Sequence, residues 1–137
     1  MANEVFKRVD DFIINWTDCT AKNGFLGLKE LIFGFKDVEI DFIERKGISY
    51  SLRAKHKNQT TRKLFVMVDV IDDEPDNRWL SVCFYGDMIS DPDEKGDLIP
   101  GGLLGEDGYC FDVEKFSEEE VNYIKERIKE AYKNAAN

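Results

Sequence analysis

The sequence contains few of the residues on which enzymes and metal proteins most often depend. His56 is its one histidine, and its three cysteines, Cys19, Cys83 and Cys110, form no C-x-x-C pair. Zinc sites and thioredoxin-type redox sites need closely spaced ligands or thiols, so neither is expected. Three widely spaced cysteines also predict no disulfide framework and favour a reducing, cytoplasmic location.

Long apolar runs and an excess of basic residues are missing as well. No stretch approaches the roughly 18–20 apolar residues of a membrane span, and no basic-then-apolar segment follows Met1, so neither a membrane span nor a signal peptide is predicted. The net charge is −9, from 28 acidic and 19 basic residues. This balance disfavours binding of nucleic acid or an anionic membrane through bulk charge.

The residues that are present have the composition and pattern of one folded domain. The 137 residues are 42% hydrophobic and 12% aromatic, which predicts a single domain over residues 1–137 with its own core. Apolar residues recur every three or four positions in three segments, which predicts helices over residues 5–16, 28–35 and 118–132. Ser117 and Glu120 have the spacing of a capping box at the start of the third helix.

Between the second and third helices the apolar period changes to that of β-strands. Alternating or continuous apolar residues predict five strands, over residues 38–42, 48–54, 64–71, 79–85 and 109–113. Short connections favour an antiparallel meander. We therefore predict an α+β fold with two N-terminal helices, a sheet of about five mainly antiparallel strands, and one C-terminal helix, with the helices packed on one sheet face.

A long acidic loop is predicted over residues 86–108, between the last two strands. Its 23 residues include seven acids, six glycines and two of the three prolines, with Lys95 as the only base. Loops of this length inside a domain are uncommon and are often functional. Leu103 and Leu104 are expected either to fold back onto the core or to meet a partner, and folding back is favoured.

Part of this loop resembles a calcium-binding EF-hand loop. Asp91, Asp93 and Gly96 fit its first, third and sixth positions, but Lys95 and Gly102 stand where oxygen ligands belong. One alternative function is therefore a divalent-metal-binding protein or metal-dependent enzyme that uses residues 87–97. Its candidate ligands are Asp91, Asp93 and Asp97, together with Asp87 and Glu94.

Basic residues gather before this loop, at the predicted tip between the second and third strands. Residues 45–68 contain seven bases and no acid, and five acids follow at once. A basic tip could contact phosphates, so a second alternative is a regulatory domain that touches nucleic acid through residues 53–63. The tip could equally be a solvated turn, which we favour, or pair with an acidic loop of the same molecule. His56 lies in this tip and is predicted to be a surface residue.

The layout also resembles a family of small bacterial domains of unknown function with a helix–meander–helix arrangement. The resemblance covers roughly residues 25–133 and rests on Leu28–Ile32 followed by Asp37–Glu39, on the glycine-rich turn before Tyr109–Val113, and on the closing segment Tyr123–Tyr132. Members of such families stand alone or are appended to nuclease domains. The resemblance carries no catalytic residue over to this chain.

The leading hypothesis is a non-catalytic binding or accessory domain, because the fold pattern is clear and no catalytic constellation is visible. We expect no cofactor and no membrane; the expected partner is a protein, and nucleic acid is disfavoured. The predicted interaction surface combines the basic tip with the leucine pair and consists of Arg53, Lys55, Lys57, Arg62, Lys63, Leu103 and Leu104.

Overall fold

The helices and strands follow the order that the hydrophobic pattern predicts, with one strand more. A computed structural model describes residues 2–114 and 117–137. Across this part of the chain, none of the helices combines the length and the apolar character needed to cross a bilayer. The elements are α1 (Ala2–Ile14), α2 (Thr20–Phe33), β1 (Val38–Arg45), β2 (Ser49–His56), β3 (Val66–Ile71), β4 (Trp79–Tyr85), the 3₁₀ turn η1 (Gly86–Met88), β5 (Asp97–Leu103), β6 (Glu106–Val113) and α3 (Glu118–Ala136).

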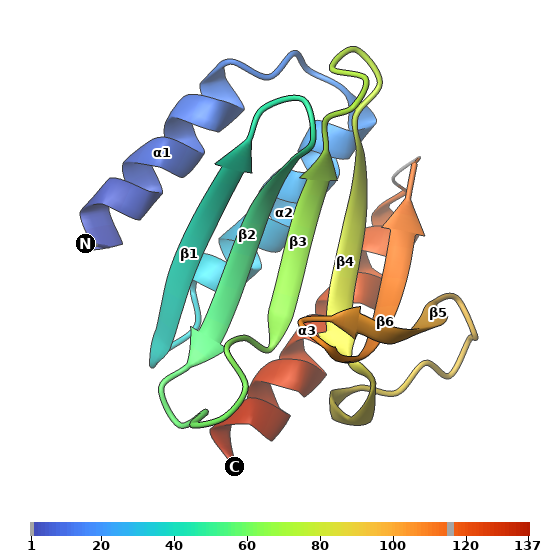
Figure 1. The fold of residues 1–137 in the computed structure, drawn as a ribbon. Coiled ribbons are helices and arrows are strands. Elements are labelled where there is room, and N and C mark those ends of the chain that lie inside the picture. The colour runs from blue at the N-terminus through green and yellow to red at the C-terminus, as the bar shows by residue number, and fades with distance from the viewer. Residues whose placement is uncertain (1, 115–116) are drawn as a thin grey trace.

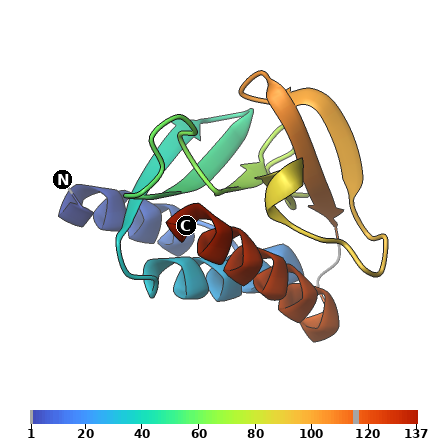
Figure 2. The same ribbon diagram turned by 90° about the horizontal axis from the view of Figure 1, so that it is seen from below.

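The strands form a single antiparallel sheet in the order β1-β2-β3-β4-β6-β5. Figure 1 shows α2 and α3 behind this sheet, and Figure 2 shows all three helices in one layer beneath it. In Figure 2 the two ends of the sheet rise away from the helices. The predicted α+β class, with helices on one sheet face, is confirmed, and no helix of the described residues lies over the opposite face.

A row of apolar side chains across five strands forms the helix-facing side of the core. Phe42, Leu52, Val68, Val82 and Phe111 are successive register partners from β1 to β6, and each is at most 3% exposed. Side chains one position away in each strand point to the other face. The apolar alternation in the sequence therefore fixes which face meets the helices.

The helix-free face has a different row, made of two charged and three sulfur-containing residues. Asp41, Arg53, Met67, Cys83 and Cys110 are also successive register partners across the same five strands. Because the neighbouring row is buried under the helices, this row lies on the open face, which is the side turned toward the viewer in Figure 1. Charged and sulfur-containing side chains therefore occupy the centre of this face.

β5 is the strand that the sequence did not predict, and the prediction of one loop over residues 86–108 is wrong from Asp97 onward. β5 pairs with β6 at the edge of the sheet, with a bulge between Ile99 and Leu103. All its residues except Leu103 are exposed, so it has no apolar alternation. Pro100 and Gly101, which read as loop residues, lie in the bulge, where Gly101 has a φ of 65°.

α2 begins earlier than the sequence predicts. Its first residue is Thr20, and the Cys19 Sγ accepts a hydrogen bond from the backbone N–H of Lys22 as the N-terminal cap. Ala21 and Gly24 are buried in its first turns. They continue the helical stripe with small residues, which a search for large apolar side chains overlooks.

The expectation that the cysteines form no disulfide is wrong for Cys83 and Cys110. The two residues face each other across β4 and β6 and form a disulfide, with their Cα atoms 4.2 Å apart. They are 27 residues apart in the sequence, and only the strand register brings them together. Cys19 is free and exposed. Because two of the three cysteines are paired, the cysteine pattern no longer favours a reducing compartment.

We expect one thiol per chain to react with a thiol reagent in the native, air-oxidised protein, and three after unfolding with a reductant. Cys19 is the exposed free thiol, whereas the disulfide protects the other two cysteines. Cys19→Ser should leave no reactive thiol in the native protein, and Cys83→Ser should make Cys110 reactive. Three reactive thiols before reduction would contradict the pairing.

His56 is buried, with 4% of its surface exposed, so its predicted surface position is wrong. Its Nδ1 accepts a hydrogen bond of 3.0 Å from the backbone N–H of Asn58, and its ring centroid lies 5.5 Å from that of Tyr132 in α3. The Asn58 side chain donates to the carbonyl of Ala136 at 2.7 Å. The end of α3 thus covers the base of the tip, which no local pattern predicts.

Candidate functional site

A hollow of about 460 Å³ lies where β1 and β2 meet the tip between β2 and β3 and the turn between β5 and β6. Small-ligand sites in proteins span roughly 300–1,000 Å³. In Figure 1 the tip and the β5–β6 turn lie near each other at the lower ends of β2 and β4. The hollow is lined by Glu39, Ile40, Asp41, Arg53, Lys55, Thr61, Lys63, Leu64, Tyr85, Leu104 and Glu106.

Two of the basic side chains in this hollow have hydrogen-bond donors without a partner among the described residues. The Arg53 Nε donates to the Ser51 Oγ at 3.1 Å. Among the described residues, no hydrogen bond or ion pair engages the terminal nitrogens of Arg53 or the Nζ of Lys63. The third base, Lys55, has its Nζ 3.9 Å from a carboxylate oxygen of Glu39. The hollow therefore offers unpaired cationic donors.

The acidic side chains of the hollow, in contrast, already have partners. Glu106 pairs with Arg62 at 3.0 Å, and Glu39 is within ion-pair distance of Lys55. The Asp41 Oδ1 accepts a hydrogen bond of 2.9 Å from the backbone N–H of Phe42. Each of the three carboxylates therefore has a partner for one of its oxygens, whereas the terminal groups of Arg53 and Lys63 have none among the described residues.

Arg62 joins three segments that border the hollow. Its guanidinium contacts Asp87 at 2.6 Å and Glu106 at 3.0 Å, and its central carbon lies 4.3 Å from the centroid of the Tyr85 ring. The hydrogen bond to Asp87 is the main influence that raises the pKa of Arg62, against the effect of desolvation. Arg62 of the basic tip therefore pairs with acidic residues of the same molecule, which is one of the alternatives that the sequence left open, and not the favoured solvated turn.

Asp69 occupies the polar centre of the open face, between Ser51 and Ser81 in the strand register. Burial raises its pKa, and the hydrogen bond from Ser51 and the charge of Arg53 only partly offset that effect. Its Oδ1 is buried and accepts no hydrogen bond from the described residues. Next to the hollow, the sheet face therefore holds a carboxyl group that is costly to charge.

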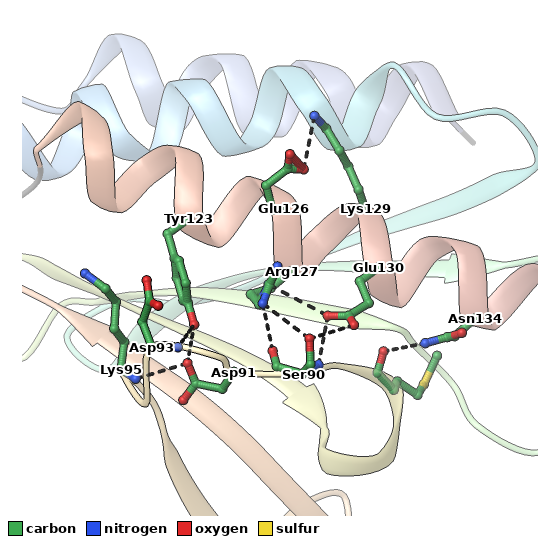
Figure 3. Close-up of polar contacts among 11 residues, drawn as sticks. Ser90, Asp91, Asp93, Lys95, Tyr123, Glu126, Arg127, Lys129, Glu130 and Asn134 are labelled. Atoms are coloured by element: carbon green, nitrogen blue, oxygen red, sulfur yellow. Dashed lines mark hydrogen bonds and ion pairs between the residues drawn. The ribbon is translucent and has the colours of Figure 1, made fainter.

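The segment between η1 and β5 is strapped to α3 by hydrogen bonds (Figure 3). The backbone N–H and the hydroxyl of Ser90 donate to the Glu130 carboxylate at 2.8 and 2.9 Å. Arg127 donates to the Ser90 carbonyl at 3.1 Å, and Asn134 donates to the Met88 carbonyl at 2.7 Å. The acidic segment is thus fixed on the helix rather than free in solvent.

Asp91 is the centre of a second group of contacts in this strap. Its carboxylate accepts hydrogen bonds from the hydroxyls of Tyr123 and Tyr109, the latter at 2.6 Å. It also accepts from the backbone N–H groups of Lys95 and Gly96, at 3.0 and 2.9 Å. Desolvation, the largest single influence, would raise the pKa of Asp91, but these four hydrogen bonds together hold it well below its usual range.

The predicted metal ligands are not gathered around a common point in the structure: two are engaged in contacts with the protein, and the others are exposed. Both oxygens of Asp91 already accept hydrogen bonds, and Asp87 pairs with Arg62. Asp93, Glu94 and Asp97 are exposed. The residues that the structure describes contain no group of three or more histidine, cysteine, aspartate or glutamate side chains able to hold a metal ion. The geometry lends the metal alternative no support.

The predicted interaction residues fall into separate groups. Four of them line the hollow: Arg53, Lys55, Lys63 and Leu104. Arg62 borders it through Glu106, whereas Lys57 pairs with Asp37 at 3.0 Å outside it. Leu103 folds back as favoured and is 1% exposed, whereas Leu104 is 53% exposed.

The sequence reasoning missed the side of the hollow contributed by β1, with Glu39 and Asp41. The signal for the β1 residues was present in the hairpin around Gly47. Apolar and polar residues alternate along both strands that flank this turn, and pairing the two strands across it places Asp41 opposite Arg53.

Comparisons with protein-family models, with curated proteins and with solved structures find no match for this chain. The resemblance to helix–meander–helix domains therefore remains a prediction, and functional inference rests on the geometry of the chain itself.

Proposed function

We propose that the protein is a non-catalytic binding domain whose ligand sits in the hollow on the helix-free side of the sheet. The observation that carries this proposal is the pairing pattern inside the hollow. Arg53 and Lys63 present unpaired donors to a space of about 460 Å³. Unpaired polar groups next to an accommodating space are the usual means by which a binding site fixes a ligand.

The chemistry of the lining favours binding over catalysis. The hollow is lined by no histidine and no cysteine, and two of its three carboxylates are within ion-pair distance of basic side chains. Nucleophilic or acid–base catalysis needs a nucleophile and a base within hydrogen-bond reach, held by a third group. Ile40 and Leu104 add apolar surface beside the charged groups.

A fragment screen monitored by the amide NMR signals of the protein tests this proposal. The screen contains equal numbers of anionic, neutral and cationic fragments. We expect the binding fragments to shift the signals of residues that line the hollow. Thr61→Trp should fill part of the hollow and weaken this binding by roughly tenfold or more, a loss of about 1.4 kcal/mol in binding free energy.

Thr60→Trp provides the matched control, because Thr60 is the exposed neighbour of Thr61 and does not line the hollow. It should bind the same fragments as the unmodified protein does. Fragments that shift signals elsewhere, or that bind the Thr61→Trp variant equally well, would refute the hollow as the binding site.

A further inference from the structure

We infer that the ligand of this hollow is a small organic anion, a carboxylate or phosphate with an apolar portion, and that Arg53 and Lys63 hold its anionic group. This inference rests on the proposed function, since it names the ligand class of the same site. Its starting point is that the two bases are the charged residues of the hollow whose terminal groups have no ion pair or hydrogen bond within the described chain.

The donors of Arg53 and Lys63 call for an acceptor that carries negative charge. A guanidinium and an ammonium group donate several hydrogen bonds and accept none. One Arg53 nitrogen already donates to Ser51, which holds the side chain and leaves its planar end free. Carboxylate and phosphate oxygens satisfy such donors with charge-assisted hydrogen bonds, and these are shorter and stronger than neutral ones.

A cationic ligand would have to compete with partners that the acidic groups of the hollow already have. To reach Glu106 it would have to compete with Arg62, which lies 3.0 Å from that carboxylate. To reach Glu39 it would have to compete with Lys55. The Asp41 Oδ1 already accepts a backbone hydrogen bond. The acidic lining and the net charge of −9 oppose an anion at long range, so selectivity must come from direct contact with the two free bases.

The remaining surface of the hollow suits carbon rather than charge. Ile40, Leu64 and Leu104 line it together with Tyr85. Leu104 is 53% exposed, so a ligand that covers it removes apolar surface from water. A short alkyl chain attached to the anionic group would use this surface within a volume typical of small-ligand sites.

Four linear probes with six carbon atoms each test the inference: hexanoate, hexyl phosphate, hexanol and hexylamine. Each is titrated into the protein while the amide signals of the hollow are followed by NMR. We expect the better anion to bind at least tenfold more tightly than hexanol, and hexylamine to bind most weakly. The ranking of hexanoate against hexyl phosphate identifies which anionic group the site prefers. Added salt should weaken the anions and leave hexanol unchanged.

Arg53→Gln and Lys63→Gln should each weaken binding of the preferred anion roughly tenfold and leave hexanol binding unaffected. Lys57→Gln is the matched control, because it removes one charge from the same tip while Lys57 pairs with Asp37 outside the hollow. Thermal unfolding of each variant checks that the fold is retained.

The outcomes separate this inference from the proposed function. If hexanol or hexylamine shifts the hollow signals as strongly as the anions do, the anionic ligand class is refuted while the binding site stands. The same holds if the two glutamine variants bind the anions as well as the unmodified protein. If neither these probes nor the fragments of the screen shift the hollow signals, both proposals are refuted.

Discussion

Replacing Arg78 by methionine is expected to lower the free energy of unfolding by about 3–5 kcal/mol, the usual cost of removing one partner from a buried ion pair. The Arg78 Nε lies 2.7 Å from the Asp72 Oδ1. The two side chains are only 13% and 2% exposed. Without the guanidinium, Asp72 would have to remain charged in a buried position or take up a proton, and both options cost stability.

The surroundings of this pair show what the substitution removes and what it keeps. The second oxygen of Asp72 accepts a hydrogen bond of 2.8 Å from the backbone N–H of Gly47, in the turn between β1 and β2. The guanidinium lies over the rings of Phe12, Trp16 and Tyr50, at 5.2, 5.4 and 5.4 Å from their centroids. Methionine can fill the apolar space among these rings, so the loss should mainly report the uncompensated carboxylate.

Urea-induced unfolding measures this loss directly, because the free energy falls linearly with denaturant concentration. The double variant Arg78→Met with Asp72→Asn should recover part of the stability, since it removes the unpaired charge. Lys129→Met, which breaks an exposed ion pair with Glu126 on α3, should change stability by no more than about 1 kcal/mol. A loss below about 1 kcal/mol for Arg78→Met would mean that the pair is not buried as described.

The parts of the fold that the sequence predicted are those in which one face is buried by large apolar residues. The strand around Phe42 and the helix around Ile128 have this pattern, because each presents one face to the core. β5 lacks it, since only Leu103 of that strand is buried. Edge strands with exposed side chains on both faces leave no periodic pattern in the sequence, so the sequence predicts a loop where β5 lies.

The candidate site was less predictable because its contacts join residues far apart in the chain. Arg53, Lys63 and Leu104 were identified as surface candidates from local charge and polarity alone. Their assembly into one hollow depends on β5 and on the contact of Arg62 with Glu106, which are 44 residues apart. A pattern search therefore found the basic tip and the leucine without finding the space between them.

Asp91→Asn is expected to lower the free energy of unfolding by about 1.5–3 kcal/mol, the range for hydrogen bonds to a charged group. It should also loosen residues 91–96, because Asp91 links them to Tyr123 of α3 and Tyr109 of β6. The asparagine side chain has the same shape but no charge, and its amide nitrogen cannot accept the hydrogen bonds that Asp91 accepts from Tyr109 and Gly96. Faster amide hydrogen exchange over residues 91–96 would report this loosening.

Asp93→Asn is the matched control, because Asp93 is exposed and contributes its backbone N–H, not its carboxylate, to the strap. It should leave both the stability and the hydrogen exchange of the segment almost unchanged. If the two variants behaved alike, the four hydrogen bonds to Asp91 would not be what stabilises residues 91–96.

The pH dependence provides an independent check on the same contacts. The pKa of Asp91 is lower in the folded protein than its usual value of about 3.9 in an unfolded chain. The charged carboxylate therefore contributes its full stabilisation above roughly pH 4, and this contribution is lost as the pH falls below that value toward the folded-state pKa. The stability difference between the unmodified protein and Asp91→Asn should accordingly shrink in acid.

At alkaline pH, the hydrogen bond to Asp91 is the main influence that raises the pKa of Tyr109 to about 12. In the variant, ultraviolet titration should show the Tyr109 pKa moving back toward its ordinary value of about 10, because the carboxylate that disfavours the phenolate is gone.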